Sequence, residues 1–167
     1  MEQCDRQWLF AFRTLYEQAS PLLATITSVD GHGAPRDLEA LLEGGDALSL
    51  LLGASRSMRV PRDKHLRALK RDFESVLQAC LTSQESARKL VTNPNHSRVI
   101  YGGLVFSTTL ANGLMEKLAG EISAMDDLTS SETFFHDFVG EQLMRLLPYR
   151  KRSLIFGPQV CELNNPA

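Results

Sequence analysis

At 167 residues the chain is long enough for one domain with a single substantial core. Its composition, with 43% hydrophobic and 23% charged residues, is ordinary for a soluble globular protein. A formal net charge of −2 gives no general reason to expect nucleic acid or acidic membranes as partners. The cysteines, Cys4, Cys80 and Cys161, lie far apart and form no Cys-x-x-Cys pair, which favours a reducing compartment over a disulfide scaffold.

The two ends of the chain predict neither a signal peptide nor a membrane anchor. The first residues, MEQCDRQW, are acidic and polar, and the last, VCELNNPA, lack an apolar run. We therefore expect a cytoplasmic protein folded as one domain over 1–167, with a loop at about 20–36 and a C-terminal tail at about 158–167.

The first apolar periodicity predicts a helix that Asp5 caps and that ends before Pro21. Its apolar positions repeat at helical spacing at Trp8, Phe12, Leu15 and Tyr16. Gly, Pro and Asp gather in the segment that follows, as in loops. His32 lies there between two glycines, but no second His or Cys stands at ligand spacing, so we expect a flexible linker rather than a metal site.

A second amphipathic helix is predicted after Asp37, which can cap it. One face of this helix carries Leu38, Leu41, Leu42, Gly45, Leu48 and Leu52. Gly44 and Gly45 in its middle each weaken a helix by roughly 1 kcal/mol relative to alanine. Such a cost indicates that another backbone must come close at this point.

A basic connection leads into the third helix, which Pro61 and Asp63 start. The segment 56–71 holds seven cations against one acid, but without interleaved aromatic residues a solvated face is favoured over nucleic-acid binding. The third helix has the cleanest periodicity of the chain, at Leu66, Leu69, Phe73, Val76, Leu77, Cys80 and Leu81. We expect Cys80 to be an inert buried thiol. A separate short helix with Ala87, Leu90 and Val91 is predicted before Asn93-Pro94.

Residues 95–118 predict one long helix that is apolar almost all the way round, with a single cation, Arg98, near its start. Asn95 can cap it. A helix that is apolar on every side lies at the centre of a helical protein or in a membrane. The longest unbroken apolar run, Val99 to Phe106, has only eight residues, so we expect a buried central helix.

A last helix is predicted after a capping turn at 126–131, ending at Pro148. Its apolar positions are Phe134, Phe135, Phe138, Val139, Leu143, Leu146 and Leu147. Because no segment alternates with period two, the sequence predicts an all-α bundle.

Catalytic signals are weak throughout. The sequence contains no Gly-x-Ser-x-Gly, no phosphate-binding loop and no His-Glu-x-x-His, and its histidines are scattered. We therefore expect no enzyme, no cofactor and no metal site, and read the chain as a helical interaction module.

Three segments resemble motifs of the Bcl-2 family of apoptosis regulators. Asn95-His96-Ser97-Arg98 resembles the family's Asn-Trp-Gly-Arg motif at the start of the central helix, with Asn95 and Arg98 matching. Leu41-x-x-x-Gly45-Asp46 resembles the core of the BH-3 motif on the second helix. Ile155-Phe156-Gly157-Pro158 resembles the aromatic-Gly-Pro sequence that ends the family's last core helices.

This resemblance implies a Bcl-2-like bundle with a buried central helical hairpin, of the viral pro-survival type. It further implies a groove that sequesters BH-3 helices of pro-apoptotic proteins, and hence an inhibitor of apoptosis that acts in the cytoplasm and at host mitochondria. In such a groove an arginine binds the ligand's aspartate by two charge-assisted hydrogen bonds. The groove residues that it suggests are Arg98, Asn95, Leu48, Leu52, Phe73, Val76, Leu77, Leu90, Val91, Tyr101, Val105 and Phe156.

Two alternatives stay open at this point. A pro-apoptotic relative that acts on membranes would share the fold, and a helical adaptor without a groove would share the composition. Because a groove lined by leucine and phenylalanine is an exposed apolar patch, we also expect the free protein to form a homodimer that buries part of it.

Overall fold

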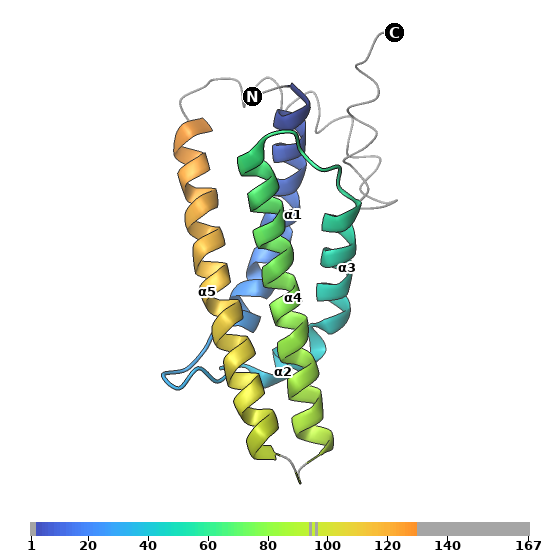
Figure 1. Ribbon diagram of the computed structural model, residues 1–167, viewed down its shortest axis with the longest axis vertical. Helices are drawn as coiled ribbons and strands as arrows, with labels where there is room; N and C mark the ends of the chain where they lie inside the picture. Colours follow the sequence, from blue (N-terminus) through green and yellow to red (C-terminus); the bar gives the residue numbers. More distant parts are fainter. Residues whose placement is uncertain (1–2, 94, 96, 130–167) are drawn as a thin grey trace.

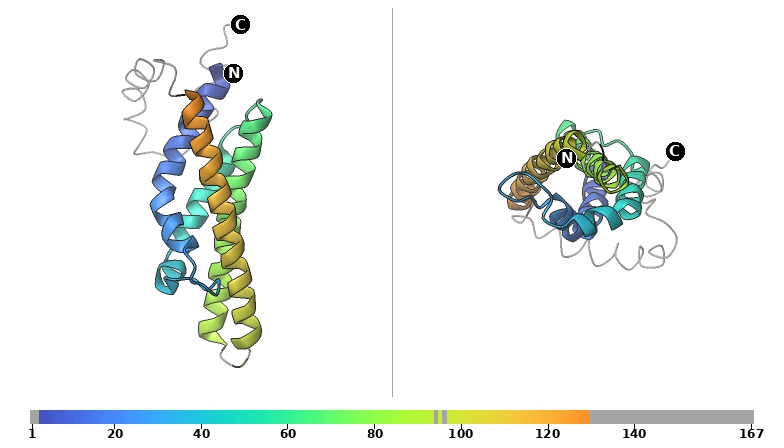
Figure 2. Two further views of the ribbon diagram at one scale, coloured as in Figure 1. Left: turned by 90° about the vertical axis from the view of Figure 1, so that its left-hand side faces the viewer. Right: turned by 90° about the horizontal axis from the view of Figure 1, so that it is seen from below.

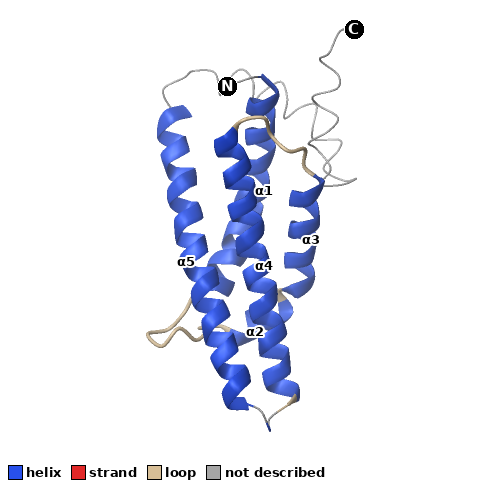
Figure 3. Cartoon of the chain, viewed as in Figure 1, coloured by secondary structure: helices blue, strands red, loops and turns tan. Residues whose placement is uncertain are grey.

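The computed structural model describes residues 3–93, 95 and 97–129, which fold into five helices (Figures 1 and 3). The helices are α1 (Gln3–Thr27), α2 (Leu38–Glu43), α3 (Gly45–Ser57), α4 (Lys64–Thr92) and α5 (Ser97–Thr129). Within these ranges there is no β-strand, only an isolated bridge between Val29 and Pro35. The prediction of an all-α fold is thus confirmed.

Helix α4 occupies the central position in the described part of the chain. It contacts each of the other helices, whereas α5 packs chiefly on α4 and to a smaller extent on α1. Figure 1 shows α4 between α5 and α3 with α1 behind it, and the left view of Figure 2 shows α1 to one side of α4 and α5. The central place that the sequence predicted for the helix after Asn95 therefore belongs to α4.

The core forms where α1, α3 and α4 face one another. Phe12 and Phe73 are fully buried and meet edge to face with ring centroids 5.4 Å apart. Trp8 stacks on Phe12 at 5.0 Å, and Tyr16 contacts the edge of Phe73 at 6.3 Å. The aromatic positions predicted from the periodicity of the first and third helices thus build one cluster.

Helix α1 is longer than predicted, because it continues through Pro21 to Thr27. A proline inside a helix removes a hydrogen bond and costs about 3 kcal/mol. Beyond it, however, Leu23 and Ile26 are almost fully buried, and each buried side chain of this size contributes about 1.5–3 kcal/mol. Burial of these two side chains outweighs the proline, so the loop predicted from about residue 20 begins only after Thr27.

Asp5 does not cap α1 but lies inside its first turn. Its buried carboxylate accepts hydrogen bonds from the backbone N–H groups of Arg62 (2.9 Å) and Asp63 (3.1 Å). Asp5 therefore ties the start of α1 to the connection between α3 and α4. Asp63 caps α4 as predicted, since its side chain accepts from the N–H groups of His65 and Leu66.

The loop between α1 and α2 is held in place, which corrects the prediction of a flexible linker. The Asp30 carboxylate accepts from the N–H groups of His32 (2.8 Å) and Ala34 (3.0 Å), and these bonds lower the pKa of Asp30. Gly33 adopts a positive φ of 81° that favours glycine. Thr108 of α5 donates from Oγ1 to the Gly33 carbonyl at 2.7 Å, so the loop packs on α5.

The predicted second helix is broken at Gly44 into α2 and α3. Gln84 of α4 reaches this break and donates from Nε2 to the Leu42 carbonyl at 2.8 Å. Carbonyls in the last turn of a helix lack a partner in their own helix, and Gln84 supplies one here. A Cβ on Gly45 would collide with the Gln84 amide. The glycines were predicted to let another backbone come close, but the group that approaches Gly45 is the side chain of Gln84.

Helix α4 runs without interruption to Thr92, so the predicted separate short helix is part of it. In its polar stretch Thr82, Ser83 and Ser86 each donate a hydroxyl hydrogen bond to the carbonyl four residues earlier, so these hydroxyls have partners within the helix. Ala87 is fully buried and prolongs the apolar stripe.

Helix α5 extends through the predicted turn at Asp126 and ends at Thr129. It buries one stripe, formed by Leu104, Ser107, Thr108, Ala111, Met115 and Leu118. Its opposite side is exposed in the described part of the chain, so the prediction that this helix is buried on every side is wrong there.

The helix predicted before Pro148, and Phe156 after it, lie outside the described residues. None of the described helices is long and apolar enough to cross a membrane.

Candidate functional site

An exposed apolar stripe follows the outer side of α5. Val99, Phe106 and Leu110 are 80%, 71% and 47% exposed. Gly102 and Gly113 lie between and beyond them at helical spacing on the same side, and a Cβ on either glycine would meet open space. We call these five residues the α5 outer face. Glycines permit the close approach of another helix, and the large apolar side chains beside them can contact its apolar anchors.

Arg98 stands at the start of this face, in the first turn of α5. Its side chain is exposed, and within the described ranges no carboxylate lies at ion-pair distance from it. Gly102 follows Arg98 at i+4 and therefore lies directly beside it on the helix surface. A guanidinium in such a place can bind an incoming carboxylate through two parallel hydrogen bonds.

The groove residues suggested by the sequence fall into two groups in the structure. One group gathers near the turn between α4 and α5. Asn95, Arg98, Val91 and Tyr101 are exposed there, whereas Leu90 and Val105 are partly covered. Val91, in the last turn of α4, is 63% exposed.

The other group lies in the interior. Its members are almost fully buried between α3 and α4 or beneath α1, and they are Leu48, Leu52, Phe73, Val76 and Leu77. These side chains are not accessible to a ligand in this structure, since contact with them would require α3 to separate from α4. The structure therefore does not bring the two groups together on one surface.

The BH-3-like motif spans the break between α2 and α3. Leu41 is fully buried and Gly45 is covered by Gln84, whereas Asp46 is exposed in the first turn of α3. Because its leucine belongs to the core, the motif is not displayed as a free helical face.

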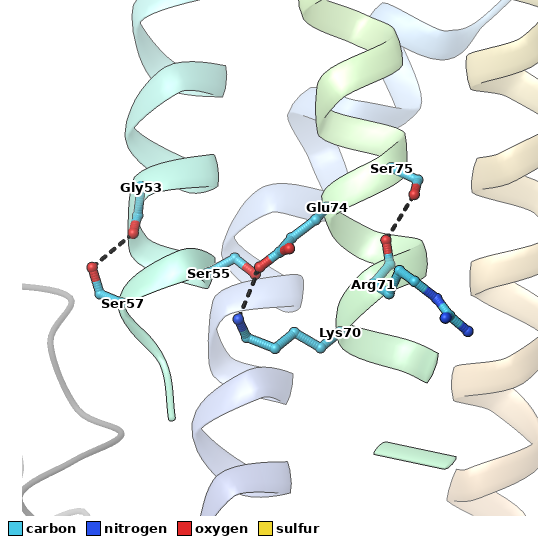
Figure 4. A network of polar contacts seen from close by, with 7 residues as sticks. All are labelled: Gly53, Ser55, Ser57, Lys70, Arg71, Glu74 and Ser75. Carbon is cyan, nitrogen blue, oxygen red and sulfur yellow. Dashed lines mark hydrogen bonds and ion pairs between the residues drawn. The ribbon is translucent and has the colours of Figure 1, made fainter. Parts of the chain in front are cut away.

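A polar network connects α3 to the first half of α4, away from the turn that leads to Arg98 (Figure 4). One oxygen of the Glu74 carboxylate, Oε1, accepts both from Ser55 Oγ at 3.0 Å and from Lys70 Nζ at 2.9 Å. Ser55 is fully buried and the Lys70 side chain is 11% exposed, so this contact is screened from solvent. Lys70 is thereby removed from the row of exposed cations at 56–71.

A small hollow between the start of α1 and the α3–α4 connection does not suit a ligand. It is lined by Cys4, Asp5, Trp8, Arg59, Val60, Pro61 and Arg62. Its volume of about 10 Å³ is close to the least that accommodates one water molecule. Within the described residues, no three metal-ligating side chains come together.

The α5 outer face was missed by the sequence analysis, which assigned Val99, Phe106 and Leu110 to the core. The sequence did contain an indication of this face. Gly102 and Gly113 lie on one side of the helix, and the buried residues of α5 lie on the opposite side. Comparison with protein-family models, with curated proteins and with solved structures found no significant match.

Proposed function

We propose that this protein is a Bcl-2-like, pro-survival helix binder that sequesters BH-3 helices of pro-apoptotic proteins and thereby inhibits apoptosis. The observation that carries the proposal is the exposed Arg98 at the head of the α5 outer face. A cation beside an apolar stripe matches a BH-3 helix, which presents apolar residues at helical spacing and an aspartate. The all-α bundle, with Asn95 and Arg98 opening α5, supports the same reading.

The α5 outer face has the dimensions that such a ligand needs. From Val99 to Gly113 it spans 15 residues, whose 14 helical rises of 1.5 Å give a length of about 21 Å. That length equals about four turns of a bound helix, enough for anchors at i, i+3 or i+4, and i+7. Gly102 and Gly113 would let the ligand backbone approach, while Phe106 and Leu110 cover its apolar side chains.

The proposed contact begins at the turn between α4 and α5 rather than between α3 and α4, because the leucines there belong to the core. Val91 and Tyr101 would lie beside the bound helix. An exposed face of this kind is also suited to a second copy of the chain, so we further propose that a homodimer competes with the ligand and lowers its apparent affinity.

A titration of BH-3 peptides from each pro-apoptotic class, followed by fluorescence, tests the function. We expect at least one class to bind. Arg98→Glu should leave the helical circular-dichroism signal unchanged and weaken binding by about 30-fold or more, since losing a partly buried charge pair costs about 2–5 kcal/mol.

The matched control is Arg88→Glu, which makes the same charge change on an exposed arginine of α4 that is not on the α5 outer face. It should bind like the parent. If no peptide binds at micromolar concentration, the proposed function is wrong. If Arg98→Glu and Arg88→Glu weaken binding equally, Arg98 is not the anchor.

A further inference from the structure

A separate surface lies at the end of the bundle where α3 connects to α4. The segment 56–71 carries seven cations and one acid, a net charge of +6, whereas the whole chain carries −2 and the remainder therefore −8. Six of the cations are exposed: Arg56, Arg59, Arg62, Lys64, Arg67 and Arg71. We call these six residues the basic end. A charge separation of this size within one small domain gives the molecule a strongly positive end and a negative remainder.

From this surface we propose that the basic end binds anionic lipid headgroups and orients the bundle on a membrane surface. The inference goes beyond the proposed sequestration of helices, because it uses residues far along α4 from Arg98. A headgroup layer is a diffuse anionic partner, to which each nearby lysine or arginine contributes separately.

An apolar tip in the middle of the basic end fits the same partner. Val60 is 62% exposed and stands between Arg59 and Pro61-Arg62. The tip is held in place, because Pro61 is buried and the Asp5 carboxylate accepts from the backbone N–H groups of Arg62 and Asp63. An aliphatic side chain ringed by cations can enter the acyl boundary while the charges remain among the headgroups.

The local sequence of α4 gives a second, independent argument. A helix N-terminus favours acidic side chains, yet the first turn of α4 contains none and instead carries Lys64, His65 and Arg67. Only the cap residue, Asp63, is acidic. Cations at this position work against the helix dipole, so their presence indicates a role other than stabilising α4.

Three acids near the basic end are engaged by groups outside it or by backbone N–H groups. Asp5 and Asp63 accept backbone hydrogen bonds, and Asp72 pairs with Lys117 of α5 at 2.7 Å. Helix α5 ends at the same end of the bundle, but it lies on the far side of α4 from α3 (Figures 1 and 2). The α3–α4 edge would therefore face the membrane.

Distance separates the two functional ends. Helix α4 has 29 residues and is about 43 Å long, whereas charges are screened within about 8 Å at physiological ionic strength. Acids toward the other end of α4 are thus outside the reach of the headgroup charge, and a bound bundle would hold Arg98 away from the membrane.

Nucleic acid fits the basic end less well. Single-stranded nucleic acids need aromatic side chains on which bases stack, and the segment 56–71 contains none. Phe73, just beyond it, is fully buried. Binding to an anionic lipid surface does not require an exposed aromatic side chain.

Co-sedimentation with vesicles tests the inference, using phosphatidylcholine alone and phosphatidylcholine with one third phosphatidylserine. We expect binding only to the anionic vesicles and release at high salt. Lys64→Gln with Arg67→Gln should reduce the partition constant roughly thirtyfold, since each cation contributes independently. Removal of cations from a helix N-terminus should not impair folding, which circular dichroism checks.

The matched control is Arg88→Gln with Lys89→Gln, which removes the same charge from exposed residues at the other end of α4. It should bind anionic vesicles within about twofold of the parent. The inference is overturned if the parent ignores anionic vesicles, if it binds neutral vesicles equally well, if both double variants lose the same affinity, or if an oligonucleotide of equal charge binds more tightly than the vesicles.

Discussion

Replacement of Gly45 by alanine probes the junction on which the arrangement of α2, α3 and α4 depends. Added to an ordinary helical site, this methyl group stabilises a helix by up to about 1 kcal/mol. Here it would occupy the place of the Gln84 amide, which must then withdraw. Withdrawal breaks the 2.8 Å hydrogen bond from Gln84 Nε2 to the Leu42 carbonyl.

The expected cost follows from that contact. A lost hydrogen bond to a covered carbonyl costs about 1–3 kcal/mol when the acceptor stays unpaired. After subtracting the helical gain of the methyl group, we expect Gly45→Ala to lower the free energy of unfolding by up to about 2 kcal/mol. In a chain of this length the corresponding drop in Tm is up to about 8 °C.

Gly53→Ala is the matched control, because Gly53 also lies in α3 and a Cβ there meets nothing within 4 Å. Urea unfolding followed by circular dichroism should show Gly53→Ala more stable than the parent and Gly45→Ala less stable. In a Gln84→Ala background the penalty of Gly45→Ala should vanish, because the collision is gone. Equal stabilisation by both alanines in the parent would refute the placement of Gln84.

Two further predictions concern the core. Phe73→Ala should lower the free energy of unfolding by about 3–5 kcal/mol in chemical denaturation, because Phe73 is a fully buried side chain; a loss below about 1 kcal/mol would show that it lines an open surface instead. Burial raises the pKa of the Cys80 thiol from 9.0 to about 12, so the stability that this thiol contributes is present below pH 9 and is lost as the pH rises toward 12. Between about pH 8 and pH 10.5 the parent should therefore lose about 2 kcal/mol more than Cys80→Ala in urea unfolding, and equal losses would contradict the burial of the thiol.

Much of the fold was predictable from local periodicity. The apolar positions of the first and third helices, Phe12 and Phe73 among them, form the core, and Asp63 caps α4 as its sequence indicated. These features depend on the spacing of residues within one helix, which the sequence shows directly.

Contacts between distant segments were not predictable in this way. Asp5 binds the backbone at Arg62 and Asp63, and Gln84 and Thr108 each reach a carbonyl in another element. Each of these bonds joins residues more than 40 positions apart, so no local sequence pattern predicts them. The Asp5 bonds connect α1 to the segment before α4, the Gln84 bond connects α4 to α2, and the Thr108 bond holds the loop before α2.

For the candidate site, the structure shows where the residues lie. Asn95 just before α5 and Arg98 in its first turn are exposed, and their role in ligand binding stays a prediction. Apolar periodicity, however, shows which residues are hydrophobic but not which of two apolar sides another element covers. For that reason Val99 and Phe106 were assigned to the core, and Leu48 was assigned to a groove although it is fully buried.

The most direct test of the account is a charge exchange across the proposed contact, measured by titration calorimetry. Four combinations are compared: the parent and Arg98→Glu, each with a BH-3 peptide and with the same peptide whose motif aspartate is changed to arginine. If Arg98 contacts the ligand aspartate, the parent should bind the natural peptide tightly, each single change should weaken binding by about 30-fold or more, and exchanging both charges should recover most of that loss. Losses that simply add in the doubly exchanged pair would contradict a direct contact between Arg98 and the ligand aspartate.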